Sequence, residues 1–177
     1  MTFPNFLSAF RLIGTFFFLF FVIRERYNIA FIIFVLQGLS DLMDGLIART
    51  FKSKTTVGAF LDPLADKFML VSSYLILTYK NIIPQWITLL VVLRDSFVLL
   101  GFIVLYRISN EKIPHPRVLG KVCTAIQAIT IAYVLWSKDD RLRLFFFYPT
   151  VILTITSGLD YLFASLRLFV RYKPMRS

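Results

Sequence analysis

The sequence predicts an all-α integral membrane protein with six transmembrane helices. Of its 177 residues, 58% are hydrophobic, whereas a soluble domain is about 45–50% apolar. Several apolar runs also reach the ~20 residues that an α-helix needs to cross a bilayer core of ~30 Å. No linker rich in Pro, Gly or Ser divides the chain, so residues 1–177 are expected to form a single membrane domain.

The six expected spans follow the apolar runs in chain order. They lie at 1–23, with a short interfacial start, and at about 27–48, 58–79, 82–107, 118–136 and 144–168. The polar triplet Arg24-Glu25-Arg26 ends the first run, and a turn from Asn81 to Pro84 follows the third. The first run lacks the basic start and the small-residue cleavage site of a signal peptide, so we expect it to be a retained span.

The basic residues indicate how these spans are oriented. The net charge is +10, which in a soluble protein would suggest nucleic acid. Here the bases cluster at span ends, which instead indicates anionic lipid headgroups, and no nucleic-acid partner is expected. Six spans place both termini, the connection at 49–57 and the loop at 107–121 on one side, where bases far outnumber acids. The positive-inside rule therefore predicts that this side is cytoplasmic, in a multi-pass protein of the cell inner membrane.

Four carboxylates stand near the facing ends of the second and third expected spans. Asp41 and Asp44 are three residues apart, and Asp62 and Asp66 are four apart, so each pair falls on one face of a helix. A short basic connection joins the spans, so the chain is expected to turn back and bring the pairs together. Four carboxylates there would repel one another and lose hydration. One or two hard divalent cations with oxygen ligands would relieve both costs.

These aspartates belong to a longer pattern, D-x-x-D-G-x-x-A-R, followed after eight residues by G-x-x-x-D-x-x-x-D. The matching positions are Asp41, Asp44, Gly45, Ala48, Arg49, Gly58, Asp62 and Asp66. Because all eight positions are filled at the expected spacing, the stretch resembles the signature of the CDP-alcohol phosphotransferase family. A shorter similarity to that family is Pro4-Asn5-x-x-Ser8-x-x-Arg11, in which Ser8 replaces the usual threonine.

The resemblance implies an activity and a set of roles. Members of the family transfer a substituted phosphate from a CDP-linked alcohol to a hydroxyl acceptor and release CMP. By resemblance Asp41, Asp44 and Asp62 would bind two Mg²⁺ or Mn²⁺ ions, and Asp66 would share a metal and accept the proton of the acceptor hydroxyl. The active site would lie at the cytoplasmic ends of the second and third spans, level with the diphosphate of CDP-diacylglycerol. The family also implies a homodimer.

Four further residues would contact the CDP-lipid by the same resemblance. They are Asn5, Gly45, Arg49 and Thr55. Ordinary structural explanations exist as well: Asn5 could cap a helix, Gly45 could allow close helix packing, and Arg49 could anchor a helix end at the interface. A guanidinium matches phosphate oxygens with paired donors, which, with its place in the motif, favours a diphosphate contact for Arg49.

The acceptor is less constrained by the sequence. The segment Gly120-Lys121-x-x-Thr124-x-x-Gln127 resembles family members that use glycerol 3-phosphate, so the first expectation is synthesis of phosphatidylglycerophosphate. Arg94, Arg117 and Lys121 are then candidates for binding the acceptor phosphate. Arg94 and its neighbour Asp95 could equally form a structural ion pair. The same pair and the segment after Gly120 also resemble the cardiolipin synthases of the family, whose acceptor is phosphatidylglycerol.

A divalent-cation or proton-coupled transporter is the alternative from a different class, because intramembrane carboxylates serve transporters too. The acids cluster at one membrane face rather than along a path across it, and the glycines and Arg49 of the motif would have no role in transport. We therefore favour the enzyme. His115 and Cys123 have no partners for a metal or nucleophilic site, so we expect a loop residue and a small buried hydrophobe.

Overall fold

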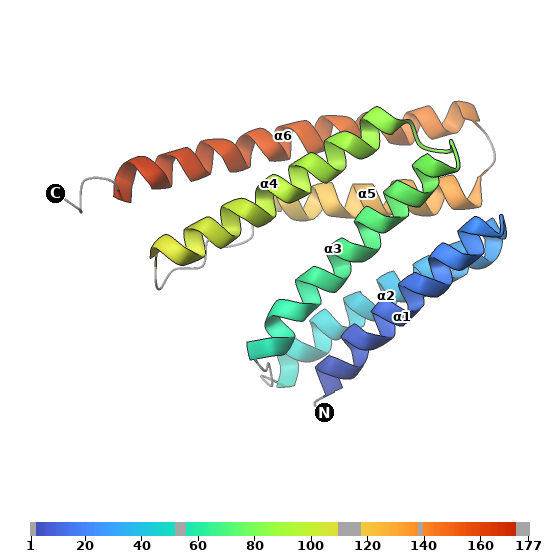
Figure 1. Ribbon diagram of the computed structural model, residues 1–177, viewed down its shortest axis with the longest axis horizontal. Helices are drawn as coiled ribbons and strands as arrows, with labels where there is room; N and C mark the ends of the chain where they lie inside the picture. The colour runs from blue at the N-terminus through green and yellow to red at the C-terminus, as the bar shows by residue number, and fades with distance from the viewer. Residues whose placement is uncertain (1–2, 52–55, 110–117, 138–139, 173–177) are drawn as a thin grey trace. The chain divides into compact units, whose positions relative to one another are not determined.

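The fold is described from a computed structural model of the chain. Its backbone is described for residues 3–51, 56–109, 118–137 and 140–172, and its side chains for residues 11–40, 67–101, 118–137 and 142–163. This described backbone forms six α-helices joined by short connections (Figure 1). They are α1 (Phe3–Ile23), α2 (Tyr27–Phe51), α3 (Thr56–Tyr79), α4 (Gln85–Ser109), α5 (Val118–Trp136) and α6 (Asp140–Tyr172).

The all-helical prediction is confirmed, and the helix ends differ from the expected ones. Helix α1 already begins at Phe3, α2 continues to Phe51, and α6 extends past its apolar run at both ends. Helix α4 begins at Gln85 rather than at Ile82, because the preceding turn uses residues up to Ile83 to cap α3. Apolar runs mark what is buried or lies in lipid, whereas backbone hydrogen bonding decides where a helix ends.

The described helices have the composition of a membrane protein. Two of them, Val118–Trp136 and Leu142–Phe163 within α6, are long and apolar enough to cross a membrane. Shorter apolar stretches lie in α1, α2 and α3, at Arg11–Ile23, Tyr27–Ser40 and Lys67–Tyr79. Large apolar side chains are exposed on several helices, among them Phe16, Leu36, Leu89, Phe97, Phe145 and Ile152. Water disfavours so much exposed apolar surface, so the structure is consistent with an all-α membrane protein.

The chain divides into two compact units. Unit 1 comprises residues 1–84 and 131–143, and therefore holds α1, α2 and α3 with the end of α5. Unit 2 comprises residues 85–130 and 144–177, and holds α4, most of α5 and most of α6. The motif aspartates belong to unit 1, and Arg94 and Lys121 belong to unit 2.

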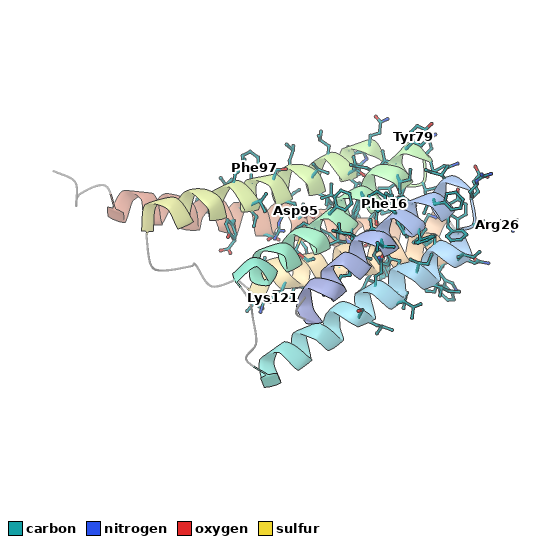
Figure 2. The ribbon with its side chains drawn as sticks, turned by 60° about the horizontal axis from the view of Figure 1, so that its bottom comes forward. Phe16, Arg26, Tyr79, Asp95, Phe97 and Lys121 are labelled. Carbon is teal, nitrogen blue, oxygen red and sulfur yellow. The ribbon has the colours of Figure 1, made fainter. Side chains whose placement is uncertain are left out.

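In unit 1, helix α1 packs against both α2 and α3. Its buried positions Arg11, Thr15, Phe18 and Val22 recur every three or four residues and therefore form one face. Phe18 meets Phe34 of α2 with ring centroids 5.7 Å apart, inside the range for favourable aromatic pairs. The opposite face of α1, which includes Phe16, is exposed (Figure 2).

Two turns of the same kind close one end of unit 1. After α1, Arg26 N–H donates to the carbonyl of Phe21, and after α3, Ile82 N–H donates to the carbonyl of Leu77. These six-to-one bonds define Schellman caps, whose C′ residue adopts a left-handed conformation. That residue is Glu25, with φ 60°, after α1 and Asn81, with φ 57°, after α3.

One ion pair connects the two turns. Lys80 Nζ donates to Glu25 Oε1 at 2.9 Å, and Arg26 and Tyr79 beside them lie at the same end of unit 1 (Figure 2). The hydrogen bond to Glu25 raises the pKa of Lys80 above its usual 10.5. Because the pKa of Lys80 is raised in the folded protein, its ion pair with Glu25 contributes fully to stability at neutral pH. That contribution is lost only as the pH rises through the raised pKa of Lys80.

The turn after α1 yields a stability prediction. Glu25→Gly is expected to raise the free energy of unfolding by about 0.5–1 kcal/mol, because glycine adopts positive φ without the clash of a Cβ atom. Asn81→Gly is the matched control. Its free energy of unfolding should rise less, since asparagine already tolerates this conformation. Thermal unfolding in detergent measures both, and a lower midpoint for Glu25→Gly would show that the lost contact with Lys80 outweighs the relieved backbone.

Candidate functional site

The four motif aspartates lie on the two helices that meet at the connection 52–55. Asp41 and Asp44 belong to α2, and Asp62 and Asp66 belong to α3; their side chains lie outside the described part of the structure. Four residues separate Phe51 from Thr56, so an extended chain could hold these helix ends at most about 18 Å apart. The prediction that the two pairs are carried by consecutive helices with a short connection is confirmed for the backbone.

Helical rise places the two aspartate pairs at similar distances from the connection, measured along each helix. At 1.5 Å per residue, Asp44 lies about 10 Å before the end of α2, and Asp62 lies about 9 Å after the start of α3. Asp41 and Asp66 both lie about 15 Å from those same ends. The two aspartate pairs therefore occupy corresponding positions along their own helices, counted from the connection.

The described residues nearest this motif in sequence tie α1 to α2. Gln37, one helical turn before Asp41, donates from Nε2 to the backbone carbonyl of Arg11 at 2.9 Å. The same carbonyl accepts a bond from Thr15 Oγ1 at 2.8 Å. Arg11 and Gln37 are each 3% exposed. On α3, Lys67 directly follows Asp66 and is half-buried.

The other proposed CDP-lipid contacts belong to segments with undescribed side chains. Asn5 lies near the start of α1, and Gly45 and Arg49 lie in the last turns of α2. Thr55, and Arg117 of the proposed acceptor site, lie outside the described residues altogether. Among the residues whose side chains are described, no group of three His, Cys, Asp or Glu could hold a metal ion.

In unit 2, Arg94 is the centre of a buried polar cluster. Its Nη1 donates to Asp95 Oδ1 at 2.7 Å, and its Nη2 donates to Ser157 of α6. Both side chains of the ion pair are at most 5% exposed. A Cβ atom added at Gly120 of α5 would lie 3.3 Å from Arg94 Nη2, so this glycine leaves room for the guanidinium. Side chains and backbone of three helices therefore surround Arg94.

A second row of polar contacts joins α5 and α6 inside unit 2. Gln127 Nε2 donates to Thr154 Oγ1 at 3.2 Å, and the hydroxyls of Thr130 and Thr150 are 2.7 Å apart. Cys123 is fully buried beside Thr154, as expected for a small hydrophobe. Lipid offers these groups no partners, so pairing between helices is the way to satisfy them.

These contacts give structural functions to several residues of the expected acceptor segment. Thr124 donates to the carbonyl of Gly120 in its own helix, and Gln127 binds α6. Lys121 is exposed in the first turns of α5 (Figure 2). Sequence reasoning did not single out Ser157 or Thr154, although Thr150, Thr154 and Ser157 recur at helical spacing within an apolar run. That stripe of small hydroxyl residues is the signal that could have found them.

The class of the protein follows from a comparison with known protein families. Residues 1–156 match the CDP-alcohol phosphatidyltransferase family. The chain therefore belongs to the CDP-alcohol phosphatidyltransferase family, and the resemblance carried by the aspartate motif is confirmed.

Individual relatives carry two kinds of name. The cardiolipin synthase (CMP-forming) of Homo sapiens is 39% identical over 127 residues, covering 68% of this chain and 39% of the relative. The same enzyme of Streptomyces coelicolor is 34% identical, covering 70% of this chain and 60% of the relative. The CDP-diacylglycerol–glycerol-3-phosphate 3-phosphatidyltransferase of Sodalis glossinidius is 33% identical and covers 76% of each chain. The chain thus spans less than two thirds of the length of these cardiolipin synthases.

The Arg94 cluster generates a prediction about stability. Asp95→Asn should keep the shape of the side chain but leave a buried guanidinium without its countercharge, at a cost of about 3 kcal/mol in the free energy of unfolding. Ser96→Ala changes the next residue, which is exposed, and should alter stability by no more than about 0.5 kcal/mol. Thermal unfolding of both purified variants tests this, and equal midpoints would contradict a structural function of the pair.

Proposed function

We propose that this protein is a phospholipid-synthesising enzyme of the membrane, a CDP-diacylglycerol-dependent phosphatidyltransferase. It transfers the phosphatidyl group of CDP-diacylglycerol to the hydroxyl of an alcohol acceptor and releases CMP. The observation that carries this proposal is that α2 and α3 each hold two motif aspartates at corresponding distances from their connection, in a chain of the CDP-alcohol phosphatidyltransferase family. Residues 1–177 are proposed to act as one domain.

The donor set fits two divalent cations. Carboxylates are hard oxygen ligands of the kind that Mg²⁺ and Mn²⁺ prefer, and Asp41, Asp44, Asp62 and Asp66 provide four of them on consecutive helices. Asp41, Asp44 and Asp62 would hold the ions, with Asp66 as a shared ligand. When bound, the ions would supply positive charge that stabilises the diphosphate and the departing CMP.

Side chains of the protein would supply the general base and the contacts to the CDP-lipid. Asp66 accepts the proton of the acceptor hydroxyl, whose oxygen forms a bond to the phosphorus that carries diacylglycerol. The bond from that phosphorus to the oxygen of CMP breaks in the same displacement, and no covalent enzyme intermediate is needed. Arg49 binds phosphate oxygens with paired donors, and Asn5, Gly45 and Thr55 contact the CDP-lipid.

We propose glycerol 3-phosphate as the acceptor, giving phosphatidylglycerophosphate. The support is the segment from Gly120 to Gln127 together with relatives named for this reaction, which match over about three quarters of both chains. Arg94, Arg117 and Lys121 are proposed to attract the acceptor phosphate. Arg94 is already paired with Asp95 and Ser157, so the exposed Lys121 has more freedom to approach it.

Phosphatidylglycerol is the second candidate acceptor, which would make the enzyme a cardiolipin synthase. The observation that favours it is the 39% identity to the human enzyme of that name. Both acceptors offer the hydroxyl of a glycerol unit that carries a phosphate, so the same chemistry serves either. A panel of acceptors tested with a single CDP-lipid separates them, because only one should give a product at substantial rate.

The setting of the enzyme is part of the proposal. Six transmembrane helices, with the site at the cytoplasmic ends of α2 and α3, would bring the diphosphate of the lipid to the carboxylates at the inner membrane. A homodimer is proposed on family resemblance alone, and the detergent-corrected mass from light scattering would refute it if the active species were a monomer.

The metal site generates the next prediction. Purified protein with CDP-diacylglycerol should release CMP in the presence of Mg²⁺ or Mn²⁺, lose this activity with a chelator, and regain it when the metal is restored. Asp41→Asn and Asp62→Asn should remain folded but lose turnover and metal-dependent binding of CDP-lipid. Substantial activity without metal would contradict the proposal, and metal uptake across vesicles without CMP release would favour a transporter.

Asp66→Asn is the matched comparison within the same experiment. It keeps the side-chain shape and one oxygen ligand but cannot accept the proton, so it should bind CDP-lipid and metal with near-normal affinity while losing most turnover. A titration of CDP-lipid binding beside the CMP-release assay measures both. Loss of binding as complete as in Asp41→Asn would make Asp66 primarily a ligand.

Orientation is tested by labelling. A cysteine placed at Lys54, in a Cys123→Ala background, should react with a membrane-impermeant reagent only after the cells are opened, because the connection between α2 and α3 is proposed to be cytoplasmic. Efficient labelling of intact cells would put the carboxylates on the opposite side of the membrane from the proposal.

A further inference from the structure

A buried polar contact crosses between helices α1 and α2 in the described part of the chain. Gln37 Nε2 donates to the carbonyl of Arg11 at 2.9 Å, across the interface between the two helices. A carbonyl can only accept, so this bond fixes which way the amide is turned. The other amide atom, Oε1, is buried and makes no hydrogen bond within the described part of the chain. The orientation of Gln37 therefore depends on the carbonyl of Arg11.

Gly14 makes this contact possible. A Cβ atom at position 14 would overlap Gln37 Nε2 and lie 3.0 Å from its Cδ. An alanine there would push the amide aside and break its bond to Arg11. Gly38, the residue after Gln37, is different, because a Cβ atom added there would have nothing within 4 Å. A side chain is therefore tolerated at position 38 but not at position 14, although both glycines lie close to the same contact.

The contact lies one helical turn from the first motif aspartate. Gln37 and Asp41 are four residues apart on α2, so they fall on the same face of that helix. That face is the one that meets α1, since Gln37 bonds to Arg11 and Phe34 meets Phe18. Arg11 in turn follows Asn5 by six residues on α1. The polar contact therefore sets how the N-terminal half of α1 lies along the face of α2 that carries Asp41.

We propose that Gly14 and Gln37 are positioning residues that hold α1 against the Asp41 face of α2 and thereby set the affinity of the enzyme for its CDP-lipid. This inference rests on the proposed phosphatidyl transfer and adds two residues outside the signature motif. Neither residue touches the reacting atoms. They act by fixing the distance between the α1 and α2 parts of the lipid-diphosphate site, where small displacements have large effects.

The test compares three single variants of the full-length protein. Gly14→Ala displaces the amide, Gln37→Met keeps a side chain of similar length without the donor, and Gly38→Ala is the control. The expected result for the first two is a KM for CDP-diacylglycerol and a Kd for the same lipid with Mg²⁺ that rise roughly 3–10-fold, about the loss of one interhelical hydrogen bond. Their KM for the acceptor should stay within about two-fold, and Gly38→Ala should match the wild type.

A double variant tests whether the two residues act through one contact. Gly14→Ala combined with Gln37→Met should be no worse than the more affected single variant, because the bond can be lost only once. If the losses of CDP-lipid affinity in the two single variants added up in the double variant, Gly14 and Gln37 would not act through one contact. Thermal midpoints that fall while the KM and Kd for CDP-lipid stay at wild-type values would overturn the positioning function and leave a purely structural contact.

The wild-type protein separates this proposal from the one on which it depends. A wild type that releases CMP, with variants indistinguishable from it in lipid affinity, overturns only the function given to Gly14 and Gln37. A wild type that releases no CMP with any acceptor overturns the proposed phosphatidyl transfer, and this inference with it. A selective loss of CDP-lipid affinity in the Gly14 and Gln37 variants, with an active wild type, supports both the positioning function and the phosphatidyl transfer.

Discussion

The described structure depends on satisfying polar groups within helices that are mostly apolar. Lipid provides no hydrogen-bond partners, so each buried donor must find an acceptor inside the protein. The helices meet this requirement in two ways. Hydroxyls bond back to carbonyls one turn earlier in their own helix, as Thr15 does to Arg11 and Thr124 does to Gly120. Other groups reach a neighbouring helix, as Gln37 and Gln127 do.

The hydrogen bonds that cross between helices also restrict how those helices can shift against each other. Leu, Ile and Phe side chains can slide past one another with little loss, because lipid is as apolar as they are. The bond from Gln37 to Arg11 and that from Arg94 to Ser157 allow much less freedom of register. Each is accompanied by a glycine, Gly14 or Gly120, that leaves space for the polar group. In each unit, therefore, a polar contact beside a glycine contributes to the register between helices.

The sequence predicted the helices well because apolar length is a direct requirement of a membrane. It predicted their ends less well. Asn81 is a recognisable left-handed turn residue, but Glu25 takes the same conformation with no such signal, since the Schellman bonds around it form only once α1 is complete. The aspartate pairs were evident from spacing along single helices. The contact of Gly14 with Gln37 was not, because it depends on how two helices lie against each other.

The length of helix α6 has a consequence for the two arginines near its C-terminal end. Its 33 residues extend about 50 Å at 1.5 Å per residue, whereas a hydrocarbon core is only ~30 Å thick. The proline at position 149 lies in its first third, and the stretch Leu142–Phe163 within it is long and apolar enough to cross a membrane. Arg167 and Arg171 belong to this same helix rather than to a loop. Because both positions belong to one continuous helix, inserting or deleting a single residue before them would turn them about the helix axis and shift them along it by about 1.5 Å.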